Sequence, residues 1–117
     1  MFNPLLRRHA MLAGGLIFAA AVLNYTVTAA AAMREATVAI SGFAFVPAQL
    51  IVPAGTRIIW TNRDDIPHTV THAATPRLFG SPALDTGERY ARVFDKPGTY
   101  RYFCAIHPHM QGVVVVQ

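Results

Sequence analysis

The chain has 117 residues, of which 53% are hydrophobic and 14% charged, and its formal net charge is +4. This length predicts a single domain. Residues 33–117 carry eight Lys or Arg and six Asp or Glu, with no two basic residues in a row. The composition therefore excludes the basic surface of a nucleic-acid-binding protein, and we expect no nucleic-acid partner.

The first 32 residues have the pattern of an export signal. Residues 7–9 (Arg-Arg-His) form a short basic region, and residues 10–33 contain no charge. The small residues Ala30 to Ala32 then suit signal cleavage. We therefore expect a cleaved signal peptide at residues 1–32, a mature domain at residues 33–117 and a periplasmic location. The alternative is an uncleaved membrane anchor, because the uncharged stretch approaches the ~20 residues that span a bilayer.

After the export signal, the chain shows short strand patterns separated by turn residues. β-Branched and aromatic residues predict strands over residues 36–45, 49–52, 56–62, 68–72, 89–94, 99–104 and 112–117. Residues 73–87 form a loop-rich connection with room for one short strand. No stretch has a helical period, so we predict an all-β antiparallel sandwich or barrel. Phe43 and Phe45 are two positions apart in the first strand, and we expect both rings on one face.

The chain's only cysteine lies in "YRYFCAIHPHM", with a histidine and a methionine at regular spacing. Cys104, His107 and Met110 are three positions apart, on the short connection between the last two predicted strands. Thiolate, imidazole and thioether are ligands that proteins offer to copper. His68 opens the predicted strand 68–72 and supplies a fourth ligand. One Cys, two His and a weakly held Met make up a blue-copper site, so we predict one copper ion cycling between Cu(I) and Cu(II).

Each of these residues also has a simpler explanation. A lone Cys or Met is more often part of the core than a ligand. Zinc is the alternative metal, although structural zinc sites take Cys and His rather than a thioether. His109 abuts Met110, and adjacent side chains do not easily face one ion, so we expect His109 to be exposed. We also expect His72 not to be a ligand, because it lies too far along the strand from His68.

Two longer segments resemble the cupredoxins, the small blue copper proteins. These segments are "FAFVPAQLIVPAGTRIIWTNRDDIPHTV" and "KPGTYRYFCAIHPHM", and the short C-x2-H-x2-M loop is most similar to that of amicyanins. The resemblance covers residues 36–117. It implies a Greek-key β-sandwich of about eight strands with the metal at one end, and it places His68, Cys104, His107 and Met110 at the ligand positions of the family.

The resemblance also implies how such a protein meets its partners. His107 would reach the surface through an apolar patch that includes Pro67, Ala105 and Pro108, and redox proteins would dock near it. In amicyanin relatives the donor and acceptor are an amine dehydrogenase and a c-type cytochrome. We expect a monomer that exchanges electrons with redox partners of this kind.

The sequence departs from the amicyanin pattern at two positions near the predicted ligands. Ile106 stands where amicyanins have a proline. Because Ile106 has a backbone N–H that proline lacks, we expect this group to donate a hydrogen bond to the sulfur of Cys104. Thr69 follows His68, the first predicted ligand, at a position where the family often has Asn. We expect its hydroxyl to brace the loop of residues 104–110, which we call the ligand loop.

The predicted function is one-electron transfer in the periplasm, and we do not expect an enzyme. Copper enzymes need further ligands, typically in HCH or HxH motifs, whereas the cysteine here is flanked by Phe103 and Ala105. The alternative function is copper delivery or storage in the periplasm, which could use the same four ligands. Slow copper release would favour the electron carrier, and rapid release to a chelator would favour delivery.

Overall fold

The computed structural model describes residues 14–17, 22, 24, 26 and 32–117. The chain divides into two units, residues 1–30 and 31–117. The described residues of the first unit belong to no helix or strand, and the expected signal peptide at residues 1–32 lies largely outside the described residues. Among the described residues, no helix is long and apolar enough to cross a membrane.

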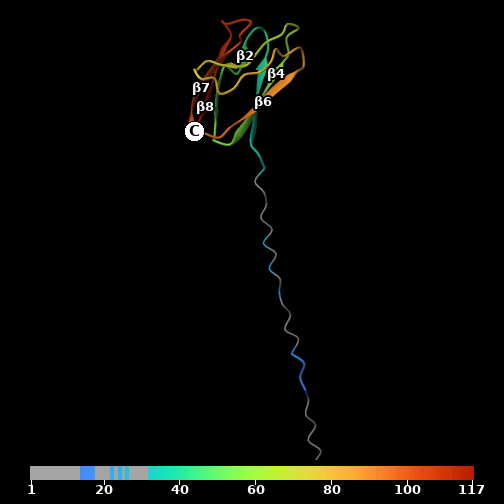
Figure 1. The fold of residues 1–117 in the computed structure, drawn as a ribbon. Coiled ribbons are helices and arrows are strands. Elements are labelled where there is room, and N and C mark those ends of the chain that lie inside the picture. The colour runs from blue at the N-terminus through green and yellow to red at the C-terminus, as the bar shows by residue number, and fades with distance from the viewer. Residues whose placement is uncertain (1–13, 18–21, 23, 25, 27–31) are drawn as a thin grey trace, which may run out of the picture. The chain divides into compact units, whose positions relative to one another are not determined.

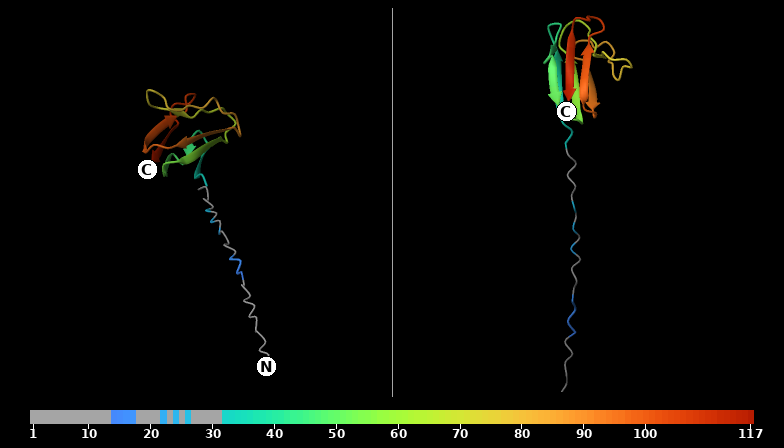
Figure 2. Two further views of the ribbon diagram at one scale, coloured as in Figure 1. Left: turned by 60° about the horizontal axis from the view of Figure 1, so that its bottom comes forward. Right: turned by 90° about the vertical axis from the view of Figure 1, so that its left-hand side faces the viewer.

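Within residues 32–117, eight strands form two four-stranded sheets (Figure 1). The strands in chain order are β1 (Glu35–Ile40), β2 (Phe45–Val46), β3 (Gln49–Val52), β4 (Thr56–Asn62), β5 (Thr71–His72), β6 (Arg89–Phe94), β7 (Gly98–Phe103) and β8 (Gln111–Val116). One sheet has the order β2-β1-β4-β6 and the other β3-β8-β7-β5. The two layers are seen from other sides in Figure 2. The predicted all-β sandwich is confirmed.

The strand pairing is mixed rather than wholly antiparallel, so that part of the prediction is wrong. β1 pairs with β4, and β3 with β8, in parallel, while the other pairs are antiparallel. β3 lies in the sheet opposite β1 and β4. The chain therefore crosses the sandwich and returns before β4 begins, which lets β4 run in the direction of β1. Short-range strand patterns carry no information about such crossings.

The core lies between the two sheets and is centred on Trp60. Alternate residues of β4 face inward, as the period of a strand requires, and Trp60 is fully buried. Its ring packs at centroid distances of 5.5 Å from Tyr102 of β7 and 6.2 Å from Phe94 of β6. Asn62, the last inward residue of β4, is also fully buried. The inward face of β4 thus ends on a polar side chain.

Residues 41–44 form a turn inside the first predicted strand. The Ser41 N–H donates to the Ala44 carbonyl at 2.9 Å, and the Ala44 N–H donates to the Ser41 carbonyl at 3.2 Å. Phe43 lies in this turn with φ of 57° and is 39% exposed, whereas Phe45 is only 2% exposed. The expectation that both rings share one face is therefore wrong, because the turn interrupts the alternation of the strand.

The predicted strand 68–72 is shortened to β5. His68 and Thr71 form isolated bridges with Leu84 and Gly80, so the backbone of this segment pairs with the long connection between β5 and β6. No strand occurs within residues 73–88 of the described chain. The connection packs back on the segment that carries His68 and fixes the place of this residue.

Candidate metal centre

Cys104, His107 and Met110 lie on the loop between β7 and β8. Figure 1 shows this loop, in orange-red, at the end of the sandwich away from the C-terminus. β7 and β8 are antiparallel neighbours, paired up to Phe103 and Gln111. The Cys104 N–H donates to the Met110 carbonyl at 3.1 Å, and the Met110 N–H donates to the His107 carbonyl at 2.9 Å. These backbone bonds close the loop and bring the three residues together.

A second segment brings His68 to the same place from another part of the chain. The backbone of His68 exchanges hydrogen bonds with Leu84, at 3.1 Å and 2.7 Å. The next residue, Thr69, donates its N–H to the sulfur of Cys104 at 3.3 Å. The His68 ring is fully buried, and its Nδ1 lies 3.7 Å from the Cys104 Sγ. Tertiary structure therefore joins residues that are 36 positions apart.

The ligand atoms of His68, Cys104 and His107 all lie within 4.8 Å of one another. The Cys104 Sγ is 3.7 Å from the His68 Nδ1 and 3.9 Å from the His107 Nδ1. Nitrogen and sulfur ligands about 2.0–2.3 Å from one metal ion in a trigonal arrangement lie roughly 3.5–4 Å apart. The spacing of these three atoms therefore fits a single metal ion, and Met110 is buried on the same loop.

The thiol of Cys104 is prepared for metal binding by its hydrogen bonds. Burial alone would raise its pKa, but the Thr69 N–H and the His68 ring favour the thiolate, and together with His107 they lower the pKa of Cys104 from 9.0 to about 6. The thiolate is the form of cysteine that binds a metal. At neutral pH the sulfur is therefore mostly deprotonated in the metal-free protein.

Asp64 and Phe43 lie next to the histidines, and neither residue was predicted to belong to the site. The Asp64 Oδ2 lies 2.8 Å from the His68 Nε2. The N–H groups of Phe43 and Gly42 donate to the same carboxylate at 3.0 Å and 2.7 Å. These hydrogen bonds lower the pKa of Asp64, although burial opposes them. The bond from the Phe43 N–H has the largest effect. The one sequence signal is an acidic residue four positions before a ligand, which is too common to single out.

The two departures from the amicyanin pattern have different outcomes. Thr69 braces the ligand loop as expected, since its Oγ1 accepts the Ala105 N–H at 2.7 Å and pairs with the Thr71 Oγ1 at 2.9 Å. Ile106 does not act as expected. In the described part of the chain, its N–H makes no hydrogen bond to the Cys104 sulfur, which accepts the N–H of Thr69 instead. Thr69 therefore contributes to the centre through both its backbone and its side chain.

The two remaining histidines of this region lie outside the cluster of ligand atoms. His109 is exposed on the loop. His72 is buried and stacks on Phe79 at a centroid distance of 4.6 Å, and its Nδ1 accepts the Leu78 N–H at 3.1 Å. Burial, and then the charge of Arg92, lower its pKa. His72 is thus a neutral packing residue apart from the predicted ligands, and the expected exposure of His109 is confirmed.

Exposed apolar residues lie around His107, the predicted ligand that reaches the surface. His107 is partly exposed, whereas His68, Cys104 and Met110 are buried. The predicted patch residues Pro67, Ala105 and Pro108 are exposed, and so are Phe43, Ile66 and Ile106. The Phe43 ring contacts the His107 ring at a centroid distance of 5.1 Å. This end of the sandwich therefore presents an apolar surface around the edge of His107.

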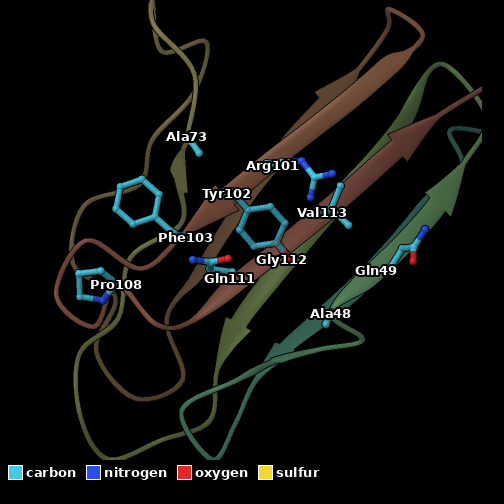
Figure 3. A pocket seen from close by; sticks show the side chains of 10 residues that line it. All are labelled: Ala48, Gln49, Ala73, Arg101, Tyr102, Phe103, Pro108, Gln111, Gly112 and Val113. Atoms are coloured by element: carbon cyan, nitrogen blue, oxygen red, sulfur yellow. The ribbon is translucent and has the colours of Figure 1, made fainter.

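A separate depression of about 440 Å³ lies on the sheet that contains β7 and β8 (Figure 3). Its lining residues are Ala48, Gln49, Ala73, Arg101, Tyr102, Phe103, Pro108, Gln111, Gly112 and Val113. Pro108 belongs to the ligand loop, but the lining contains none of the four predicted ligands. The depression is therefore distinct from the metal centre.

Comparison with known proteins agrees with this geometry. The family model described as "Cupredoxin-like domain" matches residues 14–116. Amicyanin-alpha of Methylorubrum extorquens is 34% identical over 116 residues, which cover 87% of this chain and 98% of that protein. A Cu(I) structure of an amicyanin variant is 30% identical with a TM-score of 0.67, covering 71% of this chain and 82% of that one. A structure of a Cu-containing nitrite reductase of Thermus scotoductus is 35% identical with a TM-score of 0.66. The match covers 71% of this chain but only 22% of the nitrite reductase chain.

Proposed function

The chain belongs to the cupredoxin-like family, and from this premise we propose that it carries single electrons on one copper ion held by His68, Cys104, His107 and Met110. The observation that supports this most is the convergence of two imidazole nitrogens and a thiol sulfur within 4.8 Å. Two His, one Cys and a weak Met form the ligand set of blue-copper electron-transfer sites. The thioether favours copper over zinc, which prefers Cys and His in structural sites.

The chain's own residues supply what electron transfer requires. The bound copper would supply the redox chemistry, alternating between Cu(I) and Cu(II). His68 and Cys104 have no exposed surface, so water is excluded from their ligand atoms. The loop and the segment around His68 are fixed by backbone hydrogen bonds, so the ligands keep their places when the charge at the centre changes. His107, the partly exposed member of the set, offers a short route for the electron to the surface.

The partners and the location follow from the same proposal. We propose that redox proteins dock on the apolar surface around His107, and that amicyanin-like partners, an amine dehydrogenase and a c-type cytochrome, are the first to test. The amicyanin relatives and the pattern of residues 1–32 support export to the periplasm. The match to nitrite reductase covers less than a quarter of that enzyme, so it supports a shared domain rather than an enzymatic activity.

The test is a Cu(II) titration of protein expressed from the full chain, followed by visible spectroscopy. We expect an intense thiolate-to-copper absorption that saturates at one equivalent. Cys104→Ser should abolish the band, whereas His109→Ala, an exposed histidine of the same loop, should keep it. A colourless product, or a band that survives Cys104→Ser, would refute the copper site.

Copper delivery or storage is separated from electron transfer by the rate of metal release. A buried thiolate and imidazole should release copper slowly to a competing chelator, while the loaded protein exchanges electrons rapidly with itself. Complete transfer of copper to the chelator within the time of mixing would instead favour delivery.

A further inference from the structure

We propose that Asp64 is the positioning residue of this metal centre: its carboxylate fixes His68 with Nδ1 facing Cys104 and holds Phe43 against both histidine rings. The inference rests on the proposed function, because it identifies the residue that sets the strength of one proposed ligand. Three hydrogen bonds converge on this one carboxylate, from His68, Gly42 and Phe43.

The hydrogen bond to His68 decides which ring nitrogen is free for a metal. An ionised carboxylate only accepts hydrogen bonds. The His68 Nε2, which lies 2.8 Å from the Asp64 Oδ2, must therefore carry the proton. The Nδ1, which lies 3.7 Å from the Cys104 Sγ, is therefore the ring nitrogen that faces the site and can bind a metal.

Asp64 can hold His68 because Asp64 itself is held from several sides. Its own N–H donates to the Asn62 Oδ1 at 3.0 Å, and its carbonyl accepts the Thr86 hydroxyl at 2.6 Å. Asn62 is buried at the end of β4 and donates its side-chain NH₂ to the carbonyls of Ile66 and Leu84, each at 2.8 Å. The carboxylate is thus anchored to the β-sandwich through Asn62.

The second role of the carboxylate concerns the turn that carries Phe43. The N–H groups of Gly42 and Phe43 donate to Asp64 at 2.7 Å and 3.0 Å. Phe43 has a φ of 57°, in the left-handed region that non-glycine residues seldom occupy. Its ring meets the His68 and His107 rings edge-on, at centroid distances of 5.3 Å and 5.1 Å. Asp64 therefore links the turn 41–44 to both histidines.

The carboxylate should favour the oxidised metal. An imidazole whose second nitrogen donates to a carboxylate is a more basic ligand, and a more basic ligand stabilises Cu(II) more than Cu(I). Loss of the Asp64 carboxylate should therefore weaken Cu(II) binding more than Cu(I) binding and raise the reduction potential.

The first experiment compares Asp64→Asn with Asp65→Asn in protein loaded with copper. Both variants remove one negative charge, at neighbouring positions of the chain, but Asp65 is exposed and makes no side-chain hydrogen bond in the described part of the chain. For Asp64→Asn we expect Cu(II) affinity to fall by about 10–100-fold, with a smaller fall for Cu(I) and a raised potential. Asp65→Asn should change these quantities much less. Equal shifts in the two variants would mean that only the charge matters, and would overturn the proposal.

The second experiment needs no copper, so it separates this proposal from the proposed function. In the metal-free protein at neutral pH, nuclear magnetic resonance should show a His68 Nε2–H that exchanges slowly with water. Asp64→Asn should speed this exchange, and Asp65→Asn should not. A fast-exchanging proton in the unaltered protein would overturn the proposal, even if Asp64→Asn failed to fold. Slow exchange in a protein that forms no copper–thiolate band would refute the function but leave Asp64 as the residue that orients His68.

A third variant separates the two roles of the carboxylate. Phe43→Asn removes the ring and suits the left-handed backbone, which Asn adopts more readily than Phe. It should leave the slow exchange of the His68 Nε2–H and most of the potential unchanged. If Phe43→Asn reproduced the whole potential shift of Asp64→Asn, the direct role of Asp64 on His68 would be refuted.

Discussion

Cys104 has no exposed surface, yet its surroundings favour the charged form of its side chain. Burial disfavours a thiolate, whereas a donated N–H from Thr69 and two nearby imidazole rings favour it. The second influence prevails, because the pKa of the thiol is lowered from 9.0 to about 6. Folding thus favours deprotonation of the Cys104 thiol before any metal binds. Less free energy of metal binding is then needed to form the thiolate.

The lowered pKa of Cys104 predicts a titration in the metal-free protein. The ultraviolet absorbance of the thiolate should appear with a midpoint near pH 6, and Cys104→Ser should remove this transition. A depressed folded pKa adds stability that is fully present above the unfolded pKa of about 9 and is lost as the pH falls through 6. The free energy of unfolding, compared with that of Cys104→Ser, should rise between these values by up to about 1.4 kcal/mol per pH unit. A midpoint near 9 would contradict the hydrogen bonds described for the sulfur.

At the scale of the elements, the sequence predicted the regular strands well and the irregular segments poorly. The segments 49–52, 56–62 and 89–94 were predicted with the bounds that β3, β4 and β6 have, because turn-forming residues lie close to their ends, such as Pro53, Gly55 and Pro97. The turn at residues 41–44 and the shortening of β5 were missed. Both depend on contacts with distant residues, Asp64 for the turn and Leu84 for the segment before β5, and local patterns do not encode such contacts.

The pairing of β7 with β8 depends on a glycine that faces a tyrosine. Gly112 pairs with Tyr102, and a Cβ added at Gly112 would collide with the end of the Tyr102 ring. This ring cannot easily move, because it is buried against Trp60 and Phe45. Gly112→Ala should therefore lower the free energy of unfolding by about 1–3 kcal/mol, a typical cost of overpacking, as measured by urea denaturation of the metal-free protein.

A matched variant tests whether the collision causes this loss. A Cβ added at Gly80, which is exposed, meets open space. Gly80→Ala should therefore change the free energy of unfolding by no more than about 0.5 kcal/mol. Equal losses in the two variants would show that the Tyr102 contact is not the cause.

At the scale of the whole molecule, the metal centre could be predicted only in part because the fold assembles it from distant segments of the chain. The loop spacing identified Cys104, His107 and Met110, and the resemblance to cupredoxins added weight to His68. The residues that orient the histidines, Asp64 and Phe43, come together only when the end of β4, the turn after β1 and the ligand loop meet at one end of the sandwich. Such a meeting depends on the crossing of the chain between the sheets, which has no periodic signal in the sequence.

Tyr102 lies between the two sheets and should report on the integrity of the whole core in alkali. Burial raises its pKa from 10.0 to about 12. A raised folded pKa adds stability that is fully present below pH 10 and is lost as the pH rises through 12. The free energy of unfolding should therefore fall in this window by about 1.4 kcal/mol per pH unit more than in Tyr102→Phe. Identical slopes in the two proteins would show that Tyr102 ionises as freely in the folded state as in the unfolded chain.

The compact unit of residues 31–117 is small, and copper should add to its stability. At this size the core buries a modest share of the chain's surface, and the proposed ligands come from two segments that only folding brings together. A metal that binds the folded protein alone stabilises it by about 2.7 kcal/mol when its free concentration is 100 times the dissociation constant. In a domain of this size the melting temperature should then rise by more than about 10 °C, measured by thermal unfolding at increasing Cu(II). His109→Ala should keep this rise and Cys104→Ser should lose most of it, since only the second variant removes a proposed ligand. A full rise in Cys104→Ser would mean that the stabilising copper binds elsewhere on the folded chain.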